Sequence, residues 1–282
     1  MIQYLIASAF LGLLFHGIHR KVIARVQGRP GPPIWQEFLH MLKFSFKETW
    51  IPATATPVLF MAVVIVCIGI WSAALFVVIS GGSLLIVFGL YLLHKIVEHG
   101  MGLSSGSPYG KFGAIRSVIS AASELPLLAT CGVIYLITNT LMISGIVGWQ
   151  AEHGPLIIYA LPAAAALYLI VLSKMPYSPF GNMEAKEIVS GGKTEHFGAW
   201  RAGLELGYSI KTFVLLLVFV LIFAGIFQWW IMLALMLILL ISLSFVCALS
   251  PMLSPYDALT IQAIAILIMA AYAVALGVWV WI

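Results

Sequence analysis

The sequence predicts an all-α, polytopic membrane protein that forms one transmembrane domain over residues 1–282. Three observations support this fold class. The chain is 62% hydrophobic and only 9% charged, its apolar stretches are long, and its basic residues gather in a few connections. A soluble domain of this length needs more charge to cover its surface, and so apolar a chain is not disordered. We therefore expect most of the protein to lie in lipid.

About eight segments are long enough to cross a membrane, because about 20 mostly apolar residues span its hydrocarbon core. The first has neither a basic segment before it nor a small-residue cleavage site after it, so we expect it to be retained. The predicted spans are residues 2–18, 54–80, 82–98, 114–143, 155–173, 204–227, 229–249 and 258–282.

The basic residues predict the orientation in the cell membrane. All 14 Lys and Arg residues fall on the connections after the first, third and fifth spans or at the adjoining span ends. By the positive-inside rule these connections face the cytoplasm. Both termini then face outward, as an even number of spans requires.

The first basic connection, residues 20–50, divides into two parts. Its Gly- and Pro-rich segment 28–33 cannot be helical. After it, Ile34, Phe38, Met41 and Leu42 recur at helical spacing, which predicts an amphipathic helix in the membrane interface. This helix is either a plain surface anchor or a floor on which a cytoplasmic partner docks.

The third basic connection, residues 174–203, is longer than a simple link requires, and long structured loops are usually functional or disordered. Its mixture of acidic and basic residues favours a protein interface over lipid binding. The charged residues and histidine concentrated there are Glu184, Lys186, Glu187, Lys193, Glu195 and His196.

Glu124 is the main candidate within the membrane. A carboxylate there costs a few kcal/mol, about 3 on insertion scales, and by default marks a functional site. Pro126 would free backbone carbonyls beside it, and Arg116 lies about two helical turns earlier. The alternative is a buried ion pair that only fixes packing. His94 with Glu98, and Glu205 with Lys211, are weaker candidates that could instead sit at the membrane interface.

No metal site or catalytic residue is expected on this chain. Cys67, Cys131 and Cys247 lie far apart in apolar runs, and the seven histidines show no metal-ligand spacing. Nor do we expect a nucleic-acid partner.

Several motifs then resemble one family. Residues 25–48 are similar to the first cytoplasmic loop of the membrane subunit that forms the quinone site of respiratory complex I. Residues 104–116 are similar to a segment of membrane-bound hydrogenases, and Glu124 falls where the family has an intramembrane glutamate. Residues 179–187 and 194–198 resemble the family's third loop, although Gly181 and Met183 replace its usual aspartate and proline.

The resemblance implies the membrane-anchor subunit of an energy-converting [NiFe]-hydrogenase. Such a chain holds no cofactor itself. Its partners would be the hydrogenase large and small subunits with the [NiFe] centre and iron–sulfur clusters, a polyferredoxin-like subunit, antiporter-like membrane subunits, and ferredoxin as electron donor. Ion translocation, of H⁺ or Na⁺, would involve Glu124, Arg116, Glu98, Glu205 and Lys211. The residues expected to dock the peripheral arm are Arg25, Gln27, Arg29, Gln36, Lys43, Lys47, Glu48, Glu184, Glu187, Glu195 and Arg201.

Other functions remain open at this point. A quinone-reducing complex I subunit or a sulfur-reducing relative is the nearest alternative. A secondary ion transporter would usually show internal repeats with matched broken helices, and the sequence shows no convincing repeat. An intramembrane prenyl or phosphoalcohol transferase needs several aspartates to hold Mg²⁺, but Asp257 is the only aspartate.

Overall fold

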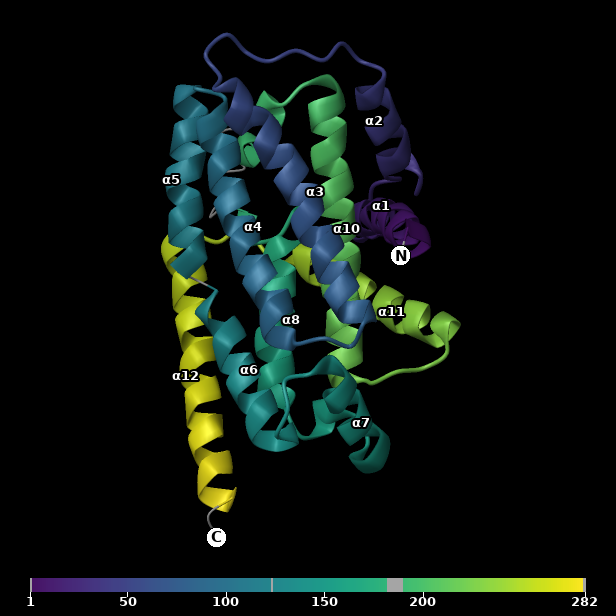
Figure 1. The fold of residues 1–282 in the computed structure, drawn as a ribbon, viewed down its shortest axis with the longest axis vertical. Coiled ribbons are helices and arrows are strands. Elements are labelled where there is room, and N and C mark those ends of the chain that lie inside the picture. Colours follow the sequence, from purple (N-terminus) through teal and green to yellow (C-terminus); the bar gives the residue numbers. More distant parts are fainter. Residues whose placement is uncertain (1, 123, 182–189, 281–282) are drawn as a thin grey trace.

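The structure is a computed structural model that describes residues 2–122, 124–181 and 190–280, and these residues form a bundle of helices (Figure 1). Six described helices are long and apolar enough to cross a membrane. They are α1 (Ile2–Val26), α3 (Pro57–Ile79), α4 (Leu84–Ser104), α10 (Gly198–Phe223), α11 (Trp229–Leu249) and α12 (Pro255–Val280). The chain is therefore a multi-pass membrane protein, as its composition predicts.

The amphipathic helix predicted in the first basic connection is present as α2 (Gln36–Ser45). It follows the Gly- and Pro-rich segment and packs against α1 and α10. None of its residues is fully buried, so it lies on the surface of the bundle with one face toward the protein.

Two predicted spans are not continuous helices. Residues 114–143 were expected as one span, but α5 (Pro108–Ala122) ends before Glu124 and α6 (Leu125–Thr138) begins after it. Pro126 occupies the first turn of α6, where its missing N–H costs no hydrogen bond. The prediction of one continuous span was wrong because the residues on both sides of this helix start are apolar, so hydropathy does not mark it.

The span predicted at residues 155–173 is also divided, into the short 3-10 helix η1 (Leu156–Ile158) and α8 (Leu161–Lys174). Pro162 lies in the first turn of α8, so a helix can start there but cannot continue through it. The connection before η1 contains an additional helix, α7 (Ile143–His153), and 3-10 helix η3 (Ser190–Glu195) precedes α10. The eight predicted spans therefore become six long helices and two shorter apolar ones, α6 and α8.

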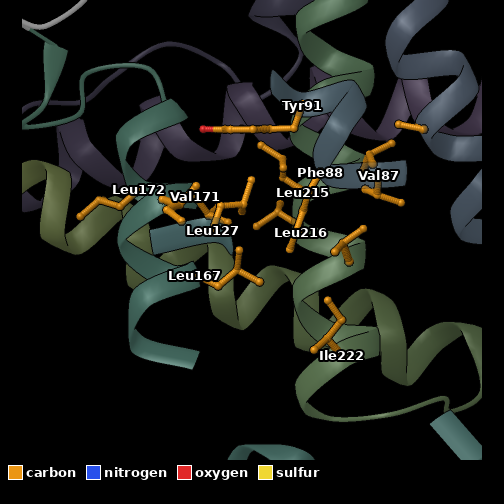
Figure 2. Close-up of a cluster of buried hydrophobic side chains, with 14 of the residues drawn as sticks. Val87, Phe88, Tyr91, Leu127, Leu167, Val171, Leu172, Leu215, Leu216 and Ile222 are labelled. Atoms are coloured by element: carbon orange, nitrogen blue, oxygen red, sulfur yellow. The ribbon is translucent and has the colours of Figure 1, made fainter. Parts of the chain in front are cut away.

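Helix α10 is the centre of the bundle and α12 lies at its edge (Figure 1). In the most apolar stretch of α10, 78% of the residues are buried, compared with 17% in α12. Helices α1, α3, α8 and α11 all pack against α10. Figure 2 shows the apolar cluster that α10 shares with α4, α6 and α8, with Tyr91 along one edge. This edge is where the polar interior begins.

Candidate functional site

A row of buried charges crosses the bundle through α4, α6, α8 and α10. Lys174 Nζ lies 2.7 Å from Glu124 Oε1, which lies 3.6 Å from Lys95 Nζ. Lys95 then contacts Glu98 Oε2 at 2.9 Å, and Glu98 Oε1 lies 3.4 Å from Lys211 Nζ. We call these five residues the buried charge row.

Two helix ends place the Glu124 end of the row. Glu124 is the residue that precedes α6, and Lys174 is the last residue of α8. A helix carries partial positive charge at its start and partial negative charge at its end, so each side chain has the sign its helix end favours. Tyr91 adds a third partner, because its hydroxyl donates to Glu124 Oε2 at 2.5 Å.

Helical spacing on α4 places the middle of the row. Tyr91, His94, Lys95 and Glu98 lie three or four residues apart, so they share one face of the helix. His94 Nε2 lies 3.2 Å from Glu98 Oε1 and 3.3 Å from Lys211 Nζ. Its ring packs edge-on against Trp71 and Tyr208, with centroids 5.3 Å apart in each case.

Burial makes the charges of this row depend on one another. Each of the five side chains is at most 7% exposed, so water does little to screen them. Removing one member of a buried pair typically costs about 3–5 kcal/mol, because it leaves the other charge unpaired. A change of charge or protonation at one end therefore alters the balance at the next member. Acids and bases of alternating sign can in this way pass on a proton or an electrostatic signal.

The structure brings together three of the five candidates for ion translocation, namely Glu124, Glu98 and Lys211. Glu98 is buried inside the bundle, and Lys211 lies 3.4 Å from it. Arg116 is half-buried on α5, whereas Glu124 directly precedes α6, so the two candidates do not belong to one continuous helix. Glu205 lies outside the row and pairs with Arg201 at 2.8 Å.

Sequence reasoning missed Lys95, Lys174 and Tyr91. Lys95 and Lys174 were used only to predict the orientation in the membrane, as basic residues near the cytoplasmic side. The spacing of three residues between Lys95 and Glu98 was a usable signal, since such residues are neighbours on a helix. Lys174 had no such signal, because its partner Glu124 is 50 residues away in the chain.

A second polar site, the loop pocket, lies where α1, α2, α10 and η3 meet. Its cavity is about 290 Å³ and is lined by His16, Arg20, Glu37, Lys193, Arg201 and Glu205, among others. Arg20 of α1 pairs with Glu37 of α2 across it, and Arg201 pairs with Glu205 one turn along α10. These pairs are 17–30% exposed, so they contact water more than the buried charge row does.

The residues predicted to dock a partner lie on the loops and their edges. Six are exposed: Arg25, Gln27, Arg29, Lys43, Lys47 and Glu48. Gln36, Glu195 and Arg201 are half-buried, while Glu184 and Glu187 lie outside the described residues.

His196, between η3 and α10, is buried with its ring stacked on Phe60 at 4.0 Å. Burial lowers its pKa to about 4, so this side chain is neutral at physiological pH. Within the part of the chain that the structure describes, no three His, Cys, Asp or Glu residues are grouped as metal ligands.

Comparisons with known proteins identify relatives along nearly the whole chain. The NADH dehydrogenase family matches residues 1–280. A protein of Methanocaldococcus jannaschii described as "Putative NADH-ubiquinone oxidoreductase" is 46% identical over 93% of this chain and 90% of its own length. Hydrogenase-4 component C of Escherichia coli is 30% identical over 73% of this chain and 69% of its own length.

A solved structure shares the fold. A chain of an archaeal membrane-bound sulfane sulfur reductase superposes with a TM-score of 0.85 at 27% identity, covering 96% of this chain and 97% of that one. The relatives are subunits of redox-driven membrane complexes. The chain belongs to the NADH dehydrogenase family and is a membrane subunit of an energy-converting complex of this kind.

Proposed function

We propose that this chain anchors a cytoplasmic redox arm and couples its electron transfer to H⁺ or Na⁺ translocation through the buried charge row. The observation that carries the proposal is the continuous sequence of contacts from Lys174 through Glu124, Lys95 and Glu98 to Lys211. Such a row is costly to keep in a membrane interior and is typical of ion pathways.

The mechanism rests on charge displacement along the row. A redox event in the arm changes the charge near the loops, which alters the protonation of the nearest acid or base. Because consecutive members lie within 3.6 Å or less of each other, the change passes laterally to neighbouring antiporter-like subunits. Those subunits would move the ion.

The arm would dock on the first and third basic connections, which we place in the cytoplasm with both termini outside. The exposed side chains of Arg25, Arg29, Lys43 and Lys47 give this side a basic surface. The partners implied by the resemblance to energy-converting hydrogenases are a [NiFe] large subunit, a small subunit and a polyferredoxin-like subunit with iron–sulfur clusters, with ferredoxin as electron donor. Those cofactors would reside in the partner chains.

A sulfur-reducing arm is the second candidate. The superposition on a chain of the sulfane sulfur reductase favours it as directly as the sequence identity to a hydrogenase component favours hydrogen evolution. Purification of the complex in mild detergent, followed by metal analysis, separates the two. Nickel with ferredoxin-dependent hydrogen evolution supports the hydrogenase arm. Iron without nickel, together with sulfur reduction, supports the sulfur-reducing arm. Reduction of a quinone would overturn both in favour of a complex I type.

The coupling itself is tested with Glu124→Gln in the purified complex, reconstituted in vesicles. We expect the complex to assemble and electron transfer to continue, while ion translocation per electron falls at least tenfold. Glu152→Gln is the matched control, because Glu152 is exposed on α7 and undergoes the same chemical change. Translocation that is unchanged by Glu124→Gln would contradict the proposal.

A further inference from the structure

Two histidines of α1 are buried but have no part in the buried charge row. His16 is 7% exposed and His19 is fully buried. Their surroundings differ, because His16 lines the loop pocket, whereas His19 binds Ser244 of α11 and the backbone carbonyl of Pro176. Of the two histidines, only His16 therefore combines a place in the lining of the loop pocket with a side-chain bond to α10, the helix that carries Lys211.

The contact between His16 and α10 is made by close helix packing. A Cβ added to Gly12 would lie 2.0 Å from the carbonyl oxygen of Ser209, so only glycine allows α1 to approach α10 this closely. About one helical turn further along each helix, His16 Nε2 meets the hydroxyl of Thr212 at 2.7 Å. The Thr212 hydroxyl also donates to the backbone carbonyl of Tyr208 at 3.1 Å, and the ring of that tyrosine is the one Lys211 packs on.

A lysine of the pocket and Lys211 of the row also pack on the same aromatic ring. Lys193, which lines the pocket, has its Nζ 3.3 Å from the centroid of the Tyr208 ring. The Nζ of Lys211 lies 4.3 Å from the same centroid. The pocket and the Lys211 end of the row are thus close neighbours, although one belongs to the loops and the other to the helical interior.

We propose that His16 and Thr212 form the proton inlet by which water in the loop pocket exchanges protons with Lys211. This inference rests on the proposed function of the buried charge row. It adds that protons enter the row at its Lys211 end, from the loop pocket, and that His16 and Thr212 carry them. Glu205, Lys193, Lys211 and His19 interact electrostatically with His16. The other charged or titratable side chains that line the pocket with it are Arg20, Glu37, His40, Tyr177 and Arg201.

The transfer is balanced in protons. Neutral His16 takes a proton from pocket water at one ring nitrogen and releases one from Nε2 to the Thr212 hydroxyl. The hydroxyl turns from its bond to the Tyr208 carbonyl and passes its own proton through an intervening water to the neutral amine of Lys211. Ring rotation or a return proton then restores His16. No bond other than O–H and N–H forms or breaks, and no electron moves. Imidazole suits this step because a neutral ring has one nitrogen that accepts a proton and one that donates a proton.

The experiment compares variants of the whole complex in vesicles, measuring the rate of proton uptake during turnover. His16→Gln keeps a polar side chain but cannot relay a proton, and Thr212→Val removes the hydroxyl at nearly constant shape. We expect each to slow proton uptake about tenfold and to raise its solvent isotope effect. Thr212→Ser should restore the rate, and added imidazole should partly rescue His16→Gly.

His19→Gln is the control for a purely structural effect, since it removes a buried histidine of the same helix that does not line the pocket. Wild-type uptake in His16→Gln or Thr212→Val, or equal losses in His19→Gln, would overturn the inlet. If His16→Gln does not assemble, the Thr212→Val and Thr212→Ser pair decides. Loss of coupling in Glu124→Gln with normal uptake in both inlet variants would refute only the inlet. Unchanged coupling in Glu124→Gln would refute the proposed function.

Discussion

The buried charge row and the loop pocket contain the same kinds of residue in different surroundings. In the row, Lys174 and Glu124 are 3% and 2% exposed, and their neighbours are further charges. In the pocket, Arg20 and Glu37 are 30% and 17% exposed. An exposed pair contributes at most about 1 kcal/mol, because water and salt screen it. A buried charge depends on its partner, so only the row can transmit a change of charge.

The largest expected effect is the loss of one charge from the row. We expect Lys174→Met to lower the free energy of unfolding by about 3–5 kcal/mol, because Glu124 loses its nearest cation. Titration of the purified protein from mild detergent into a denaturing one measures this change. The double variant with Glu124→Gln should recover most of the stability but none of the ion translocation. If Lys174→Met lowered the free energy of unfolding by less than about 1 kcal/mol, the row would be no more sensitive to a lost charge than the exposed pairs of the loop pocket.

The apolar cluster next to the row provides a second test. Leu216 is completely buried, and Leu216→Ala should lower the free energy of unfolding by about 2–4 kcal/mol through the cavity it leaves. Unlike Lys174→Met, it should leave the number of ions translocated per electron unchanged in assembled complexes. If coupling fell as far as in Glu124→Gln, the special role of the charges would be refuted.

His196 gives the loop region a pH dependence of known sign. Its pKa is lowered to about 4 in the folded protein, so below about pH 6.5 the unfolded chain binds a proton that the folded one does not. Stability should therefore decrease by about 2–3 kcal/mol as pH falls from about 6.5 to about 4, and no further below that. Thermal unfolding of wild type and His196→Phe across this range measures it; the variant should lack this component. If the stability of both proteins fell equally with pH, a group other than His196 would cause the acid sensitivity.

The smallest effect is expected at the exposed pair. Arg20→Gln should lower the free energy of unfolding by at most about 1 kcal/mol, and by less in high salt. Lys21→Gln, which changes a half-buried neighbour, is the control for charge alone. If Arg20→Gln lowered the free energy of unfolding by several kcal/mol at every salt concentration, Arg20 would behave like a member of the buried charge row.

Much of the fold was predictable because lipid imposes strong constraints on sequence. The long apolar helices and α2 were recognised from hydropathy and helical spacing. The breaks at Glu124 and Pro162 were not, because a proline in an apolar stretch can begin a helix or bend one. Of the candidate site, Glu124 was identified as an acid in an apolar region, and Glu98 and Lys211 as weaker candidates.

The sequence by itself determined that this is a multi-pass helical membrane protein with charges confined to a few positions, since each charge in lipid is costly. The tertiary structure alone decided which charges of different helices meet. Lys174 reaches Glu124 from another helix, and Lys211 reaches Glu98 across 113 residues. Helical spacing relates residues only within one helix. Pairing between helices depends on packing, such as the close approach at Gly12 that brings His16 to Thr212.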